Sequence, residues 1–231
     1  MLKKFCLLLF LPLVISACTP RRAIVHHPLV KETHPPRIAQ QPEFIIVDAG
    51  HGGKDSGTLS TRYDYEEKHL TLSTAHMISR YLNYLGYETE MTRYDDIYIP
   101  LSKRAEIANS HKADLFVSIH YNSSPSESAD GVEVFYYNEE ESLERALESK
   151  SLGTKVLSRL IRHTGANSRG VKTANFAVIR ETKMPAVLVE AGFLTNAEER
   201  KKLQDPHYRR FIAWGIACGI DEYCCQNRSS P

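Results

Sequence analysis

Short apolar runs alternate with helical patterns along most of this 231-residue chain, and this alternation restricts it to the α/β class. Three runs are almost continuously apolar, at residues 44–47, 115–119 and 186–189. Such runs are typical of strands that are covered on both faces. Weaker strand patterns lie at 87–92, 132–137 and 176–179. We therefore expect a single three-layer αβα domain with a mostly parallel sheet.

Apolar residues at three- and four-residue spacing predict the helices that connect these strands. The clearest pattern runs from Glu67 to Leu85 and ends at Gly86, a residue that commonly terminates helices. Further helices are predicted near 101–108, 140–163 and 208–223.

The first 17 residues have the order of a secretory signal peptide, with two lysines, an apolar run and then small residues. The apolar run covers only about half of the ~20 residues that span a bilayer. Residues 15–18, Ile-Ser-Ala-Cys, resemble a bacterial lipoprotein processing site. This resemblance implies cleavage before Cys18 and a membrane anchor through lipid on its side chain.

Five prolines in residues 19–42 predict that 18–42 is an extended tether. We interpret its three histidines as solvated linker residues, because they lack spaced partners for a metal. The folded domain is then expected over 43–223, with a tail at 224–231. The region after the tether contains three cysteines, Cys218, Cys224 and Cys225. We interpret them as structural, although one pair can form a disulfide in an oxidising envelope.

Charge argues against nucleic acid as a partner. The chain has 29 basic and 28 acidic side chains, for a formal net charge of +1. Because the leader and tether are basic, the predicted domain is mildly acidic. Binding to phosphates needs a concentrated basic surface, which this domain lacks.

Three predicted strands end in residues that can bind a metal. His51 follows the first strand within a glycine cluster, His120 ends the second, and Glu190 ends the third. The carboxyl ends of parallel strands meet at one crevice, so these side chains are expected to converge. Two histidines and one carboxylate form a typical catalytic zinc set, whose acidic member is Glu190, Glu66 or Glu67.

Five motifs in this order resemble the zinc-dependent N-acetylmuramoyl-L-alanine amidases, the amidase_3 group of cell-wall hydrolases. They are Asp48–Gly53, Glu67-Lys68, Ser118–Asn122, Arg169–Lys172 and Pro185–Asn196. The resemblance covers 43–223 and implies a mixed sheet between helices, a fold of the zinc-exopeptidase type. It also implies that His51, Glu67 and His120 bind Zn²⁺ and that Glu190 is the catalytic residue.

The implied activity is hydrolysis of the amide between N-acetylmuramic acid and L-alanine in peptidoglycan. One alternative is a zinc peptidase or carboxypeptidase that cuts inside the stem peptide, because the same machinery hydrolyses any amide. Another is a non-catalytic peptidoglycan-binding lipoprotein. We expect a periplasmic, membrane-anchored monomer, and the sequence identifies no activating partner.

Four further side chains are candidates for supporting roles. Asp48 is predicted to orient His51. Arg104, Arg169 and Arg180 are candidates to bind stem-peptide carboxylates, with structural ion pairs as the alternative for each.

The chain departs from the family pattern at three places. Tyr121 replaces a small residue, and loop 58–65 lacks a second glycine; both are expected to reshape the groove without removing a ligand. Regulated members carry an inhibitory helix where this chain has 123–168, a stretch long enough for one strand and one helix. We therefore predict no autoinhibitory insertion, an expectation that Glu144 or Glu148 capping the metal would contradict.

Overall fold

The computed structural model describes residues 43–60, 65–138 and 142–228. These residues form a six-stranded sheet in the order β4-β1-β5-β8-β6-β7 and a separate two-stranded β2-β3 sheet. The strands are β1 Phe44–Ala49, β2 Leu59–Ser60, β3 Tyr65–Glu66, β4 Glu88–Met91, β5 Leu115–Asn122, β6 Val132–Tyr136, β7 Ser168–Thr173 and β8 Ala186–Phe193. The predicted signal peptide and tether lie outside the described residues.

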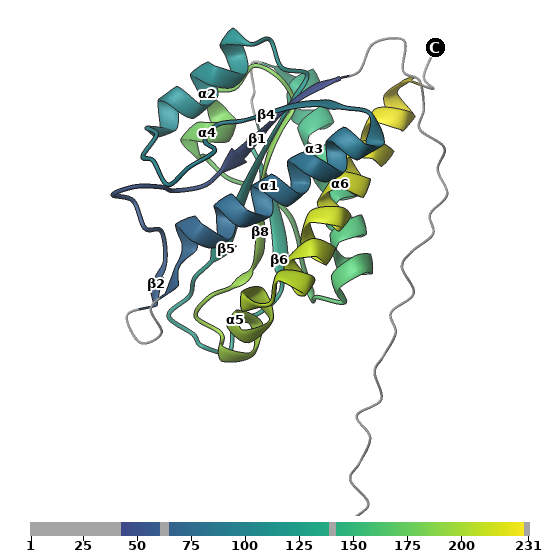
Figure 1. Ribbon diagram of the computed structural model, residues 1–231. Coiled ribbons are helices and arrows are strands. Elements are labelled where there is room, and N and C mark those ends of the chain that lie inside the picture. The colour runs from purple at the N-terminus through teal and green to yellow at the C-terminus, as the bar shows by residue number, and fades with distance from the viewer. Residues whose placement is uncertain (1–42, 61–64, 139–141, 229–231) are drawn as a thin grey trace, which may run out of the picture. The chain divides into compact units, whose positions relative to one another are not determined.

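The described residues form six helices, of which α1 to α4 connect strands and α5 and α6 follow the last strand, and five of the six form two layers around the sheet (Figure 1). They are α1 Glu67–Leu85, α2 Leu101–Ser110, α3 Leu143–Thr164, α4 Ala177–Arg180, α5 Ala197–Gln204 and α6 Pro206–Arg228. Helices α1, α3 and α6 cover one face, and α2 and α4 cover the other. None of the described helices combines the length and the apolar character needed to cross a membrane.

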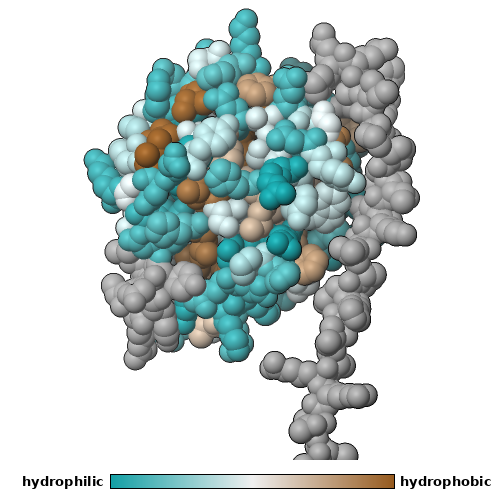
Figure 2. Space-filling view, viewed as in Figure 1, coloured by the Kyte–Doolittle hydropathy of each residue, from teal (hydrophilic) through white to brown (hydrophobic). Residues whose placement is uncertain are grey.

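Alternate residues of β1 face the two layers, as expected for a strand buried on both sides. Ile45 and Val47 belong to the larger core cluster, together with residues of α1, α3 and α6. Ile46 belongs to a smaller cluster that includes Ala108 of α2 and Ile179 of α4. The face shown in Figure 2 is mostly hydrophilic with apolar residues scattered across it, since the apolar runs lie inside these clusters.

The predicted α/β class and mostly parallel mixed sheet are confirmed. Strands β4, β1, β5 and β8 are parallel, whereas β6 is antiparallel to β8 and β7 is parallel to β6. The described part of 123–168 holds β6, α3 and the start of β7, so it adds no further helix. Glu144 and Glu148 lie in α3, and neither lines the pocket described below.

One strand prediction is wrong, and four described elements were not predicted: the short strands β2 and β3, strand β7 and helix α5. Residues 177–180 form α4 rather than a strand, because a short apolar run fits a buried helical turn equally well. Strand β7 has one large apolar residue, Val171, so it lacks a hydrophobic pattern. Helix α5 is strongly charged, but Asn196 caps it and Glu199 follows three residues later, a capping signal that could have located it.

Two glycines allow α3 and α6 to pack closely. A methyl group on Gly219 would lie 2.4 Å from Cα of Val156, and one on Gly215 would lie 2.8 Å from Cα of Leu160. Backbone atoms cannot move aside as side chains can, so these two positions require the smallest residue.

We expect Gly219→Ala to lower the free energy of unfolding by about 1–3 kcal/mol, because overpacking forces the helices apart. Alanine ordinarily favours a helix over glycine by about 1 kcal/mol, so the predicted sign is the reverse of the propensity effect. Urea denaturation measures the change. Lys150→Ala at an exposed position of α3 is the control. A Gly219→Ala protein at least as stable as the parent would contradict the close packing.

Candidate metal centre

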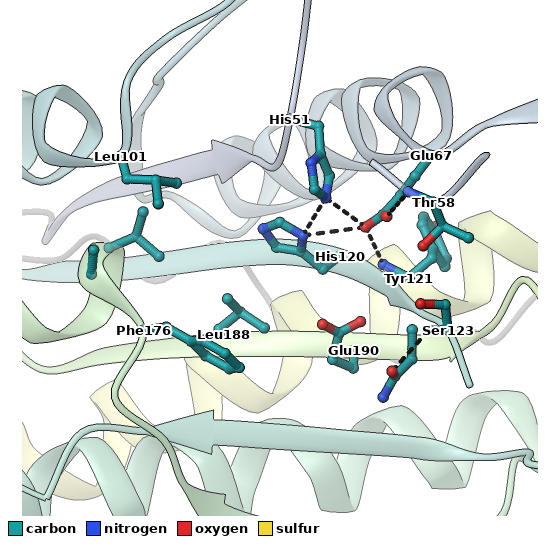
Figure 3. Close-up of a pocket in the computed structure, with 13 residues that line it drawn as sticks. His51, Thr58, Glu67, Leu101, His120, Tyr121, Ser123, Phe176, Leu188 and Glu190 are labelled. Atoms are coloured by element: carbon teal, nitrogen blue, oxygen red, sulfur yellow. Dashed lines mark hydrogen bonds and ion pairs between the residues drawn. The ribbon is translucent and has the colours of Figure 1, made fainter. Parts of the chain in front are cut away.

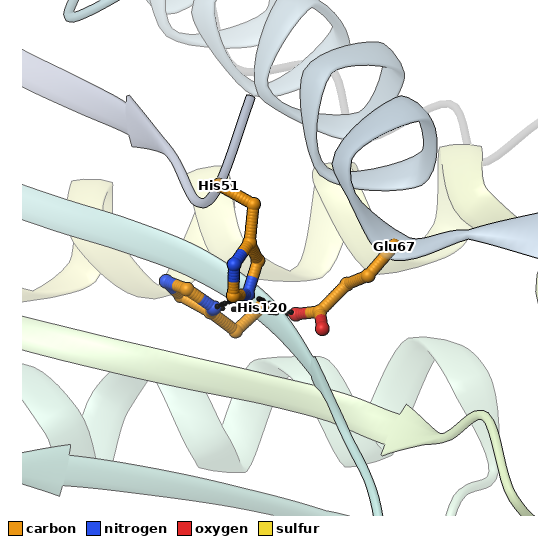
Figure 4. Close-up of side chains that lie close together, drawn as sticks. All are labelled: His51, Glu67 and His120. Carbon is orange, nitrogen blue, oxygen red and sulfur yellow. Dashed lines mark hydrogen bonds and ion pairs between the residues drawn. The ribbon is translucent and has the colours of Figure 1, made fainter. Parts of the chain in front are cut away.

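His51, Glu67 and His120 come together at the carboxyl ends of the parallel strands. His51 follows β1, His120 lies near the end of the neighbouring strand β5, and Glu67 begins α1. One ligand atom from each of the three side chains lies within 4.8 Å of the other two. Figure 4 shows the three side chains pointing toward a common centre.

The geometry selects which atom of each side chain faces this centre. Nε2 of His51 lies 3.1 Å from Oε1 of Glu67, and Nδ1 of His120 lies 3.2 Å from the same oxygen. Nδ1 of His51 lies 3.0 Å from Oδ1 of Asp55. A hydrogen bond to this carboxylate leaves Nε2 of His51 free to bind an ion.

The electrostatics of the three side chains favour a cation. Burial alone would raise the pKa of Glu67, but hydrogen bonds and charges from His120 and His51 hold it well below its usual range. The pKa of His51 is raised, because Glu67 and Asp55 outweigh the opposing effect of burial. Two imidazole nitrogens and an ionised carboxylate are the donor set of a catalytic zinc site, so these residues fit a divalent ion.

Backbone N–H groups hold the Glu67 carboxylate in place. Oε1 accepts a hydrogen bond of 2.9 Å from the N–H of Tyr121, and Oε2 accepts one of 2.9 Å from the N–H of Thr58. The neighbouring Glu66 points elsewhere, since its carboxylate accepts a hydrogen bond from Ser56 and pairs with Lys68. Of the two adjacent glutamates, the structure therefore brings Glu67 into the cluster.

Gly50 makes room for the second histidine. A methyl group on Gly50 would lie 2.2 Å from Cε1 of the His120 ring. Any larger residue at this position would displace the imidazole, so the glycine in this loop is required by close approach rather than by backbone torsion.

Two buried arginines hold the loop that carries His51. Arg93 donates to the carbonyl oxygens of Ala49 and Gly50, and Arg104 donates to those of Ala49 and His51. His51 itself has a left-handed backbone, with φ of 59°. The arginines supply hydrogen bonds that a strained turn at the end of a strand cannot make within the sheet.

The predicted role of Asp48 is wrong. Its carboxylate accepts hydrogen bonds from Thr92, Ser118 and Arg104, and these lie on the side of the strand opposite the larger core. Asp55, which the sequence analysis did not single out, is the residue that contacts His51. The position of Asp55, four residues after His51, was the one sequence signal that could have indicated this contact.

Arg104 is also not a substrate-binding residue. It is 1% exposed and paired with Asp48, so a peptide carboxylate cannot reach it. Arg180 at the end of α4 is partly exposed and bonds to Asn175 and Glu181. Arg169 is not among the pocket-lining residues, and it pairs with Glu133.

A pocket of about 300 Å³ opens over the metal ligands. Figure 3 shows Leu101, Phe176 and Leu188 on one side of the histidines and Thr58 and Ser123 on the other. The groove therefore has an apolar half and a polar half.

Glu190 lines the pocket between these halves. Its Oε2 atom is buried and has no hydrogen-bond partner among the described residues. Burial, followed by the charges of Glu67 and Glu133, raises the pKa of Glu190 well above its ordinary value. A carboxyl group with a raised pKa that faces a pocket is suited to exchange a proton with a molecule bound there.

Tyr121 departs from the family pattern, but its hydroxyl does not enter the groove. Its side chain is 1% exposed, and the hydroxyl lies 2.6 Å from Oγ1 of Thr74 in the core. Part of loop 58–65 lies outside the described residues, so the second expected change in the groove stays a prediction.

Comparison with known proteins agrees with this site. Residues 45–222 match the family described as N-acetylmuramoyl-L-alanine amidase, Amidase_3. The chain belongs to this family. A curated relative, the N-acetylmuramoyl-L-alanine amidase LytC of Bacillus subtilis, is 38% identical over 181 residues, which cover 78% of this chain and 35% of LytC.

Solved structures of amidases share the fold. An N-acetylmuramoyl-L-alanine amidase from Clostridium difficile 630 is 35% identical, with a TM-score of 0.75 over 80% of this chain and 97% of that one. The amidase CwlD of Clostridioides difficile, solved in complex with the GerS lipoprotein, is 31% identical, with a TM-score of 0.74 over 80% of this chain and 99% of that one. The likeness thus covers the domain that holds the metal ligands.

We expect Asp55→Ala to weaken the binding of a divalent ion about 10- to 100-fold, because His51 loses the carboxylate that orients its ring. Competition with a chelator for Zn²⁺ or Co²⁺ measures this affinity. Asp95→Ala is the control, since Asp95 is exposed on the neighbouring loop. Equal affinities for the parent and Asp55→Ala would show that the ring needs no such support.

Proposed function

We propose that this protein is a zinc-dependent hydrolase that cleaves the amide between N-acetylmuramic acid and L-alanine in peptidoglycan. The observation that carries the proposal is the Glu190 carboxyl, whose buried Oε2 atom has no hydrogen-bond partner among the described residues and which lines the pocket with His51, Glu67 and His120. Metal ligands alone would also suit a binding protein, but an adjacent proton-exchanging carboxyl is a requirement of hydrolysis.

The chain's own residues divide the chemistry between them. Bound to His51, Glu67 and His120, zinc would lower the pKa of a water molecule to about 7 and polarise the amide carbonyl. Glu190 takes a proton from the attacking water and delivers it to the leaving nitrogen of L-alanine. An amine leaves poorly unless it is protonated, so the same carboxyl acts first as base and then as acid.

The raised pKa of Glu190 suits the second of these steps. A raised pKa keeps more of the carboxyl group protonated at a given pH than an ordinary pKa would, so more of it can donate a proton to the leaving nitrogen. Burial is the main cause of the shift, and the nearby charges of Glu67 and Glu133 add to it.

A peptidase that cuts within the stem peptide remains the rival enzyme, because these residues would hydrolyse another amide in the same way. The names of the relatives favour the amidase: both LytC and the Clostridium difficile 630 structure are N-acetylmuramoyl-L-alanine amidases. The chain spans only 35% of the length of LytC, so the activity is proposed for the matched domain alone.

We expect the domain to release peptides with a free N-terminal L-alanine from purified sacculi and to leave the glycan strands intact. We expect Glu190→Gln to reduce the rate about 10²- to 10⁴-fold, because proton transfer is lost while the ligands remain. Mass spectrometry of the products measures both. Glu198→Gln on α5 is the control, because Glu198 is exposed.

Two outcomes would count against this proposal. Products that retain L-alanine on muramic acid would identify a peptidase. Undiminished digestion by Glu190→Gln would remove Glu190 from the mechanism.

We also propose that the mature protein is anchored in the cell envelope through lipid on Cys18. The motif at residues 15–18 and the tether that follows it support this location, because a tether would let an anchored domain reach the wall.

We expect Cys18→Ser to move the protein from the membrane fraction to the soluble fraction of the envelope. Fractionation followed by immunoblotting measures the distribution, and Cys225→Ser is the control at the other end of the chain. Unchanged membrane association of Cys18→Ser would rule out the lipid anchor.

A further inference from the structure

Two cations on the edge strand β7 converge on one buried carboxylate beside the pocket. Arg169 and Lys172 both pair with Oε2 of Glu133. We propose that this cation pair forms a subsite for a carboxylate carried by the second residue of the leaving peptide. The inference rests on the proposed amidase function, because it names a part of that substrate.

An irregularity in β7 brings the two cations together. In a regular strand, residues three apart in sequence point to opposite faces. Between β6 and β7 the register shifts, so that Val132 pairs with Ser168 but Val134 pairs with Val171. The extra residue lies at Gly170, whose φ is 92°. This bulge places Arg169 and Lys172 on the same side of the sheet, and bulges beside active sites commonly re-aim side chains in this way.

Two cations share one carboxylate here. Glu133 is the one acidic side chain with which either Arg169 or Lys172 forms an ion pair among the described residues. The side chains of Arg169 and Lys172 are 37% and 42% exposed, whereas that of Glu133 is 6% exposed. The two cationic side chains are therefore partly open to solvent, where an anionic ligand can meet them.

The guanidinium of Arg169 is also held in position. Its Cζ atom lies 4.9 Å from the centre of the Phe193 ring, and Nη1 donates to the carbonyl oxygen of Asp130. These contacts use the ring face, Nε and Nη1, and no hydrogen bond of Nη2 is found among the described residues. An arginine fixed in this way loses little further entropy when it binds a carboxylate.

The subsite is continuous with the reaction centre. Glu133 lies directly opposite Glu190 in the antiparallel β6-β8 pair, so the two side chains share a face of the sheet. Asn122, which lines the pocket, donates from Nδ2 to Oε1 of Glu133. Asn122 and Glu190, which both line the pocket, thus adjoin the Glu133 carboxylate that holds the cation pair.

Spacing matches the second residue of the peptide. Strand β7 lies two strands from β8, or about 10 Å in the hydrogen-bonding direction. The cationic side chains reach back toward Glu133, which shortens this distance. Two extended residues span about 7 Å, so a carboxylate on the second residue reaches the pair while the first holds the scissile nitrogen at Glu190.

The test compares two peptidoglycans that differ at one group. One carries D-glutamate with a free α-carboxylate at the second stem position, and the other carries the α-carboxamide there. We expect the wild-type protein to release peptides from the carboxylate form at least about tenfold faster at sub-saturating substrate, because a charged hydrogen bond is lost with the carboxamide.

Variants then assign the preference to the cation pair. Lys172→Gln and Arg169→Gln should each reduce the preference, Lys172→Arg should retain it, and Lys150→Gln on α3 is the charge-matched control. The ratio of the two rates within one preparation does not depend on how much of it is folded. A variant that is partly destabilised because Glu133 has lost a partner therefore still gives a valid ratio of the two rates.

The outcomes separate the two proposals. If the wild-type protein digests both substrates at equal rates, the subsite is overturned and the amidase function stands. If Lys172→Gln and Arg169→Gln lower both rates equally and keep the preference, the subsite lies elsewhere and this assignment is overturned. If neither substrate yields peptides with free L-alanine, the proposed function itself fails, and the subsite fails with it.

Discussion

The metal centre depends on how Arg93 and Arg104 hold the end of β1. Both side chains are 1% exposed, and together they bind the carbonyl oxygens of three consecutive residues, 49–51. Asp48 offsets part of their charge, and Arg104 in turn holds the pKa of Asp48 below its usual range although burial opposes this. Removing either Asp48 or Arg104 would leave an uncompensated buried charge. The ion pair therefore stabilises both the turn at residues 49–51 and the core next to it.

Much of the site could be predicted from the sequence because it follows from the topology. His51, His120 and Glu190 each follow an apolar run, and parallel strands bring their carboxyl ends together. Glu67 was harder to predict, because the adjacent Glu66 is the same residue type and only the family resemblance separated them. The structure distinguishes them through the N–H groups of Thr58 and Tyr121, which periodicity cannot reveal.

The supporting residues were less predictable for a related reason. Asp48 is next to the metal loop in sequence, yet it shares a strand face with Ile46 and therefore points toward α2. Sequence proximity suggested a contact with His51 that strand alternation excludes. Strand β7 was not predicted because its residues are mostly polar or charged and include the glycine of a bulge. The hydrophobic pattern on which strand prediction relies is therefore absent.

The bulge in β7 has a consequence for solubility as well. Strands β7 and β4 are the two edges of the sheet, and an exposed edge with unpaired N–H and C=O groups can recruit a second chain into a continuous sheet. Strand β7 counters this with an irregular backbone and two cations, and β4 with Glu88 and Glu90. Edge charges of opposite sign could attract each other, but the irregular backbone of β7 disrupts the regular hydrogen-bond ladder that edge pairing would need. The sheet is thereby protected from aggregation at an edge that stays open to solvent.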